Sequence, residues 1–172
     1  MKLSALSTLE YPPYYELYFS VLSPNTDLYE ALESSYHDFE TFIHDIPLEK
    51  HDFRYDTGKW TIKEIIQHLI DCERIFAYRA LRFSRNDKAE LAGFDEGSYA
   101  QNSHGNSREL DDLMHEFSCV RQSSSALFKS LTKEQLTQKG KANNMDITVR
   151  ALGFVIIAHQ QHHQKIYNER YL

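Results

Sequence analysis

The residues with the clearest chemistry lie near the C-terminal end of the chain, in the run His159-Gln160-Gln161-His162-His163. The outer histidines are four residues apart, a spacing that places two imidazoles one turn apart on one face of a helix, where both can bind a single metal ion. Both also fall within the apolar stripe of this segment, so their rings are predicted to point into the core. Buried imidazoles need partners, which are either a metal ion or hydrogen bonds from other helices.

A third histidine lies in an earlier segment that the sequence predicts as a helix. Thr61 and Glu64 form the pattern of a capping box, in which hydroxyl and carboxylate satisfy each other's backbone donors, and apolar residues then recur at helical intervals to about residue 85. His68 lies at the edge of that apolar stripe. It is therefore the natural third ligand, since metal sites in helix bundles form from inward side chains on facing helices.

Three histidine ligands leave one coordination position of a divalent ion open. Because the ligands are neutral, the ion keeps its full charge and can lower the pKa of a bound water to about 7. The same position can instead hold a thiolate and keep it nucleophilic. Gln160 follows His159 where the HExxH metalloprotease pattern has glutamate, and a glutamine cannot abstract a proton. Peptidase activity is therefore discounted, and no residue is assigned as catalytic.

The rest of the chain predicts the elements that must position these ligands. Apolar residues recur at helical intervals in four long segments, and no segment shows convincing strand alternation. The polar stretch 139–146 is interpreted as a linker, and 86–106 as a long connection with a short helical turn near 95–100. The predicted helices span about residues 27–46, 62–85, 107–130 and 148–172. This pattern indicates an all-α fold, an antiparallel-type four-helix bundle.

The chain is expected to form a single domain preceded by an arm. A length of 172 residues suits one domain with a substantial core. Residues 1–26 contain Pro12 and Pro13 among tyrosines, which predicts an irregular N-terminal arm that packs on the bundle. Residues 27–172 are expected to form the bundle domain.

Composition narrows the range of partners and compartments. A formal net charge of −6 without a dense Lys/Arg cluster argues against nucleic acid or an anionic membrane surface, so a small-molecule partner is expected. Cys72 and Cys119 have neither the spacing nor the number of a disulfide framework, which predicts free thiols in a reducing compartment. No apolar run approaches the roughly 18 residues of a membrane span, and a cytoplasmic protein is expected.

Several residues of the predicted second helix have both a functional and a structural interpretation. Cys72, one turn after His68, can reach the metal or pack as a small buried thiol, and packing is favoured. Asp71 can orient an imidazole, although its direction points away from His68. Four charged residues can meet an anionic substrate, although ion pairing within the helix is favoured: Glu73, Arg74, Arg79 and Arg82.

Four motifs in this order resemble the DinB superfamily, and most closely its YfiT-like branch of candidate metal-dependent hydrolases. They are the stretches Trp60–Asp71, Glu73–Arg79, Gly93–Glu96 and His159–His163. The resemblance spans about residues 27–172 and implies a four-helix bundle with an up-down-down-up path, often dimeric. It also implies a divalent metal, nickel or zinc, held by one histidine of the second helix and a histidine pair of the fourth.

Carried onto this chain, the ligands that the resemblance implies are His68, His159 and His163. Some relatives transfer low-molecular-weight thiols to electrophiles, whereas others have no established reaction. Relatives often carry glutamate at the position of Gln160, so the effect of the glutamine here is open.

Three functional hypotheses follow. The first, which is favoured, is a metal-dependent enzyme that acts on a small molecule, either as a hydrolase or as a low-molecular-weight thiol S-transferase. The second is a non-catalytic metal or small-ligand binding protein of the stress response. The third is a structural homodimer whose metal pins the second helix to the fourth. An enzyme needs an open coordination position, whereas a fourth ligand from Cys72 or His162 would indicate a structural site.

Overall fold

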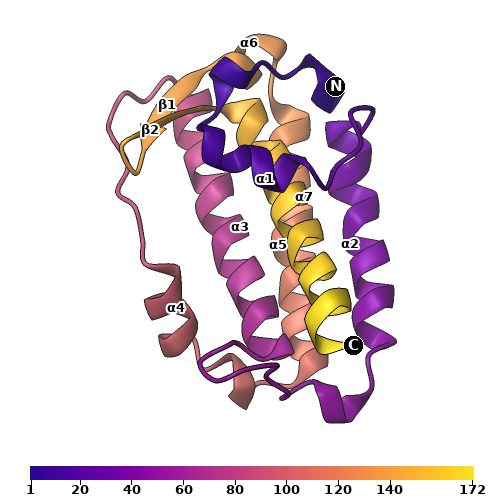
Figure 1. Ribbon diagram of the computed structural model, residues 1–172. Helices are drawn as coiled ribbons and strands as arrows, with labels where there is room; N and C mark the ends of the chain where they lie inside the picture. The colour runs from indigo at the N-terminus through magenta and orange to yellow at the C-terminus, as the bar shows by residue number, and fades with distance from the viewer.

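The computed structural model describes residues 1–172 and is an all-α four-helix bundle, as predicted. Its long helices are α2 (Leu28–His44), α3 (Ile62–Ser84), α5 (Leu110–Ser130) and α7 (Val149–Ile166). Figure 1 shows that α3 and α5 run in the same direction, while α2 and α7 run the opposite way, which is the predicted up-down-down-up path. No helix combines the length and apolar character needed to cross a membrane.

Shorter elements lie at the two ends of the bundle and along its side. The connection between α3 and α5 runs the full length of the bundle and carries α4 (Figure 1). The chain ends in a π-helical turn after α7. The short elements are the 3-10 turns Leu3–Ala5, Thr8–Glu10, Pro13–Tyr15, Leu48–Lys50 and Gly105–Ser107, α1 (Glu16–Phe19), α4 (Glu96–Asn102), α6 (Lys133–Thr137), β1 (Lys139–Ala142), β2 (Met145–Thr148) and the π turn Tyr167–Tyr171.

The helix starts follow from side chains that satisfy free backbone N–H groups. At the start of α3 the Thr61 hydroxyl accepts from the Glu64 N–H at 3.1 Å, and the Glu64 carboxylate accepts from the Thr61 N–H at 2.8 Å. Asp27 caps α2 and Thr148 caps α7 in the same way with a single side chain. The predicted helix starts at these positions therefore agree with the structure.

The stretch 139–146, interpreted as a polar linker, instead contributes most of an antiparallel hairpin. Strands β1 and β2 pair in register from Lys139 opposite Thr148 to Ala142 opposite Met145. Asn143 and Asn144 form the turn with positive φ angles of 51° and 60°, a conformation that asparagine tolerates and tight hairpin turns need. The interpretation was wrong because the strands are too short and polar to show an alternating pattern.

Residues 1–26 lie across α7 and the hairpin end of the bundle, with α1 in front of α7 in Figure 1. The Glu10 carboxylate accepts from the Arg150 Nε at 2.6 Å and from the Thr148 hydroxyl at 3.0 Å. Asp27, which caps α2, also pairs with the N-terminal amine of Met1. These contacts tie the N-terminal residues to the starts of α2 and α7.

The core consists of two apolar clusters at opposite ends of the bundle. The cluster at the hairpin end includes Leu28 of α2 and Phe83 of α3. The cluster at the other end includes Ile43 of α2, Ile66 of α3 and Tyr167 of the C-terminal turn. Between the two clusters every long helix contributes a buried polar side chain.

This buried polar layer joins all four long helices through Arg121 of α5. Its guanidinium donates to both carboxylate oxygens of Glu73 on α3 at 2.9 to 3.1 Å. It also donates to the Ser35 hydroxyl of α2 at 2.8 Å and to the Gln160 amide oxygen of α7 at 2.9 Å. Gln160 in turn donates to the Ser35 carbonyl at 2.8 Å. The Arg121 and Glu73 side chains are each only 3% exposed, so each charge is stabilised by the other and not by water.

Replacing Arg121 alone is expected to be strongly destabilising, because it leaves the Glu73 carboxylate buried without a counter-charge. We expect Arg121→Met to lower the free energy of unfolding by about 3–5 kcal/mol in a denaturant titration. The double variant Glu73→Met/Arg121→Met should recover much of that loss, because no unpaired charge remains. The matched control Arg74→Met removes a half-exposed arginine of α3 and should cost about 0–1 kcal/mol. Equal losses for Arg121→Met and the control would contradict this account.

Gly140 of β1 allows the hairpin to approach α3 closely, since a Cβ at this position would overlap the ring of the buried Phe83. We expect Gly140→Ala to lower the free energy of unfolding by about 1–3 kcal/mol, because the ring or the hairpin must move. Gly97→Ala in the exposed helix α4 is the control and should be neutral or stabilising by up to about 1 kcal/mol. A stabilising effect of Gly140→Ala would show that the contact is looser than described.

Candidate metal centre

The structure brings the three predicted ligands together between α3 and α7. The Nε2 atom of His159 lies 3.1 Å from Nε2 of His68 and 3.2 Å from Nε2 of His163. The rings of His68 and His163 have centroids 5.1 Å apart. The Nε2 atom of His159 therefore lies close to one ring nitrogen of each of the other two imidazoles, between α3 and α7.

This arrangement fits a divalent metal better than it fits hydrogen bonding alone. Two nitrogens bound to one zinc ion at about 2.0–2.1 Å with tetrahedral geometry are about 3.3 Å apart, close to the separations seen here. A neutral imidazole nitrogen carries either one proton or one lone pair, so His159 Nε2 can form one good hydrogen bond with only one of its two neighbours. A cation among the three nitrogens satisfies all of them.

Burial keeps these histidines neutral and so leaves their lone pairs available. Loss of solvent lowers the pKa of His68 to about 4. Burial also lowers the pKa of His159 well below its usual value, and the nearby His163, His68 and His162 add to this effect. The pKa of His163 is lowered for the same reason, first by burial and then by His68 and His162. At neutral pH the cluster can therefore bind a cation without first losing protons.

Aromatic rings enclose the cluster on several sides. The ring centroids of Trp60 and His68 are 4.8 Å apart. The centroids of Phe76 and Tyr18 lie 5.9 and 5.6 Å from the centroid of His159. Such walls exclude water and strengthen electrostatic interactions inside. Trp60 thus covers a predicted ligand. His162 is half-buried outside the cluster, with its ring against Tyr18 at 4.9 Å.

His163 Nδ1 is buried and has no hydrogen-bond partner. Metal-binding histidines usually donate their second N–H to a carboxylate, a carbonyl or water, so this position departs from the common arrangement. Asp71, the carboxylate considered for such a role, accepts from the Gln67 amide at 3.0 Å instead. The sequence-based direction of Asp71, away from His68, agrees with this contact.

Cys72 lies closer to the histidines than the sequence-based preference for a packing role suggests. Its sulfur is 3.5 Å from Nδ1 and 3.7 Å from Nε2 of His68. The ligand atoms of His68, Cys72 and His159 all lie within 4.8 Å of one another, so the possible metal-binding group that this distance defines contains Cys72 and leaves out His163. Burial, followed by the charge of Glu96, raises the pKa of the Cys72 thiol, which is therefore protonated in the absence of a metal.

Gln160 does not face the histidine cluster. Its amide bridges Arg121 and the Ser35 carbonyl, on the side of α7 that packs against α2 and α5. From the sequence, Gln160 was considered as a residue near the metal that, unlike glutamate, cannot accept a proton. In the structure its amide instead completes the buried polar layer. A glutamine can accept from Arg121 and donate to Ser35 at once, which an ionised carboxylate cannot do.

Sequence reasoning missed Arg121 and misjudged the charged residues of α3. Arg121 follows Phe117 by one turn and so falls on an apolar stripe, which was the available signal of a buried charge. Three of the four charged α3 residues pair with other elements or with the chain after the helix, not with neighbours inside the helix. These pairs are Glu73 with Arg121, Arg74 with Glu116, and Arg82 with Asp87.

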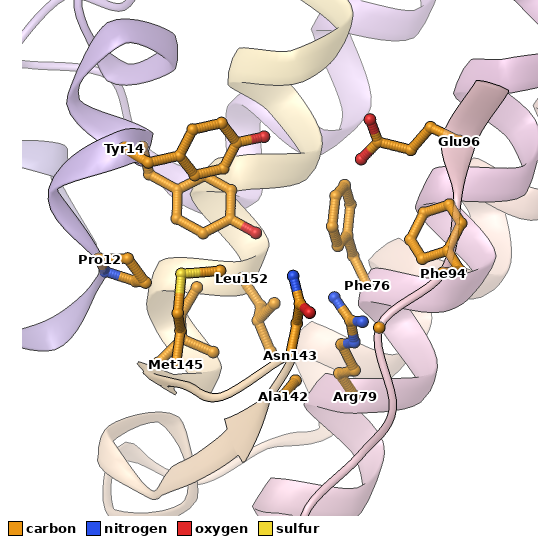
Figure 2. A pocket seen from close by; sticks show the side chains of 13 residues that line it. Pro12, Tyr14, Phe76, Arg79, Phe94, Glu96, Ala142, Asn143, Met145 and Leu152 are labelled. Carbon is orange, nitrogen blue, oxygen red and sulfur yellow. The ribbon is translucent and has the colours of Figure 1, made fainter.

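Arg79 is the fourth of these residues, and it has no carboxylate within ion-pair distance. Its side chain borders a cavity of about 230 Å³ between α3, the α3–α5 connection, the hairpin and the N-terminal residues (Figure 2). Phe76 is a wall of this cavity and also contacts His159, so the cavity adjoins the histidine cluster.

Known proteins match this chain in sequence profile and in fold. The profile of the DinB superfamily matches residues 31–166. YfiT from Bacillus subtilis, described as a probable metal-dependent hydrolase with an unusual four-helix bundle topology, is 17% identical with a TM-score of 0.71, and the match covers 83% of this chain and 85% of YfiT. The DinB-like protein YjoA from Bacillus subtilis is 17% identical with a TM-score of 0.57, covering 85% of this chain and 90% of YjoA.

At these identities the two structures establish the fold alone. No curated protein sequence matches the chain. The profile match covers most of the chain, including the segments that carry all three histidines of the cluster. The chain therefore belongs to the DinB superfamily.

Proposed function

We propose that this protein is a metal-dependent enzyme that acts on a small molecule, with a divalent ion held by His68, His159 and His163. The observation that carries the proposal is the close approach of three buried, neutral imidazoles, in which His159 Nε2 lies 3.1 Å from Nε2 of His68 and 3.2 Å from Nε2 of His163. The similarity to YfiT, described as a probable metal-dependent hydrolase, supports the same class of activity. Zinc and nickel are the ions expected from the resemblance, and both accept imidazole ligands.

The proposed ion and the residues around it would have different roles in a reaction. A divalent ion held by three neutral imidazoles supplies an undiminished positive charge that lowers the pKa of a water or thiol beside it. Trp60, Phe76 and Tyr18 limit the access of bulk water to this point. Glu73, the buried carboxylate of α3, is fully engaged with Arg121, so it is not assigned as a general base.

A non-catalytic or structural metal site is the second candidate, and the position of Cys72 favours it. Its sulfur, 3.5 Å from the His68 ring, could close the coordination shell as a fourth protein ligand. A closed shell has no place for a substrate. The two candidates are therefore distinguished by whether Cys72 binds the metal.

Loss of any one proposed ligand is expected to abolish metal retention. We expect tag-free wild-type protein to carry near-stoichiometric zinc or nickel by elemental analysis, and His68→Ala, His159→Ala and His163→Ala each to lose it. His162→Ala is the matched control, because His162 lies on the same helix outside the cluster, and it should keep the metal. Equal metal content in wild type and the triple alanine variant would disprove the site.

The role of Cys72 can be read from the spectrum of the Co²⁺-substituted protein. For the open site that we propose, Cys72→Ala should retain the metal, and wild type should show no thiolate-to-metal charge-transfer band. A band that disappears in Cys72→Ala would instead establish a closed site with a cysteine ligand. Cys119→Ser, which removes the exposed thiol, is the control for general thiol effects.

The two proposed reactions differ in their need for a second substrate. A low-molecular-weight thiol S-transferase loses its activity toward an electrophile when the thiol is withheld, whereas a hydrolase does not. Each activity should also disappear in His159→Ala. The expected homodimer rests on the family resemblance, and light scattering of the purified protein tests it.

A further inference from the structure

The cavity beside α3 is lined by groups from several separate parts of the chain (Figure 2). Phe76 and Arg79 come from α3, Phe94 from the α3–α5 connection, Asn143 from the hairpin turn and Tyr14 from the N-terminal residues. Most of the lining is apolar or aromatic, and a few polar side chains converge within it. This combination is typical of sites that bind small organic molecules.

Arg79 is a buried cation without a counter-ion. Its residue is 6% exposed, and its guanidinium makes one hydrogen bond, from Nη2 to the Ala92 carbonyl at 3.1 Å. The guanidinium also lies over the Phe94 ring, with its central carbon 5.9 Å from the centroid. Arginine remains charged even where burial opposes it, and buried charges in proteins are usually paired. The remaining N–H donors of Arg79 make no hydrogen bond within the chain and are accessible to solvent, so they are free to donate to an acceptor in the cavity.

The nearest carboxylate in the lining does not fill this need. Glu96, in the first turn of α4, is exposed and lies beyond ion-pair distance of Arg79. In Figure 2 the Glu96 carboxylate and the Arg79 guanidinium lie at different levels of the cavity. Glu96 can therefore compete weakly for Arg79, but it does not neutralise it.

The polar wall next to Arg79 is held in place by the backbone. The N–H of Asn143 donates to the Leu91 carbonyl at 3.0 Å, and the Leu91 N–H donates to the Lys141 carbonyl at 2.9 Å, so the hairpin is docked on the connection. The Asn143 side chain then lies against Gly93, where any Cβ would overlap it. The cavity is thus formed before a ligand binds, and Figure 2 shows the Asn143 amide beside Arg79, with its oxygen on the side of the guanidinium.

We propose that this cavity binds the carboxylate of a small monoanionic acid with an apolar or aromatic body. The planar guanidinium of Arg79 matches a carboxylate in a two-point contact, and a single buried positive charge balances a single negative one. Phe76 and Phe94 offer apolar surface to the rest of the molecule. The volume of about 230 Å³ suits a small acid rather than a drug-sized ligand.

Calorimetric titration with benzoate and with its neutral counterpart benzamide tests the proposal. Benzoate should bind wild type at millimolar or lower concentration, and benzamide should bind about tenfold more weakly or not at all. Arg79→Met should weaken benzoate binding by about tenfold or more. Arg74→Met makes the same change of net charge on the same helix, and it should alter binding less than about twofold, since Arg74 lies outside the cavity.

Two further variants separate this proposal from loss of fold and from the metal centre. Glu96→Gln should tighten benzoate binding, because it removes a competing anion from the lining. His159→Ala should still bind benzoate, so failure of the metal site leaves this test intact. We expect Arg79→Met to match wild type in its circular dichroism spectrum and metal content. Weaker benzoate binding then reports the loss of the guanidinium contact and not a loss of fold.

The proposal is overturned by any of three results. These are no benzoate binding to wild type, equal binding of benzoate and benzamide, or unchanged benzoate binding in a folded Arg79→Met variant. Phenyl phosphate is a useful second probe, because its dianionic head costs more to desolvate in this largely apolar cavity, and it should bind more weakly than benzoate. Tighter binding of phenyl phosphate would overturn the assignment to carboxylates.

Discussion

The buried pair of Arg121 and Glu73 is the constraint on which the arrangement of the helices depends. Apolar faces alone allow helices to slide or rotate at small cost, because many packings bury similar area. The pair, with Ser35 and Gln160, requires one defined position of each long helix, since a misplaced partner leaves a charge buried alone. Gln160 follows His159 directly, so the same network sets the rotation of α7 that turns His159 toward α3.

The histidine cluster is a consequence of that rotation, and it is costly without a ligand. His159 Nε2 lies 3.1 Å from Nε2 of His68 and 3.2 Å from Nε2 of His163, and a neutral imidazole nitrogen cannot form a good hydrogen bond with both. A protein selected for stability alone would fill this space with apolar side chains. The divalent ion that we propose would satisfy these Nε2 atoms and so account for the cluster.

The three arginines of α3 differ in their partners, and the elements packed around each one account for the difference. Arg74 and Arg82 meet carboxylates of α5 and of the connection, whereas Arg79 meets a backbone carbonyl and aromatic rings. All three lie on one helix within a few turns, and nothing in their spacing distinguishes them. The difference arises because the hairpin and the N-terminal residues close a cavity over one of them (Figures 1 and 2).

By itself the sequence determined the four helices, several of their starting residues and the face of each helix that is buried, because caps and apolar periodicity are local properties. It also placed His68, His159 and His163 on inward faces. The tertiary structure decided what each inward polar group meets: Arg121 with Glu73, Gln160 with Ser35, Arg79 with no carboxylate, and the docked hairpin that looked like a linker. Periodicity reports burial, whereas partners come from segments far apart in the chain, so only the folded packing could identify them.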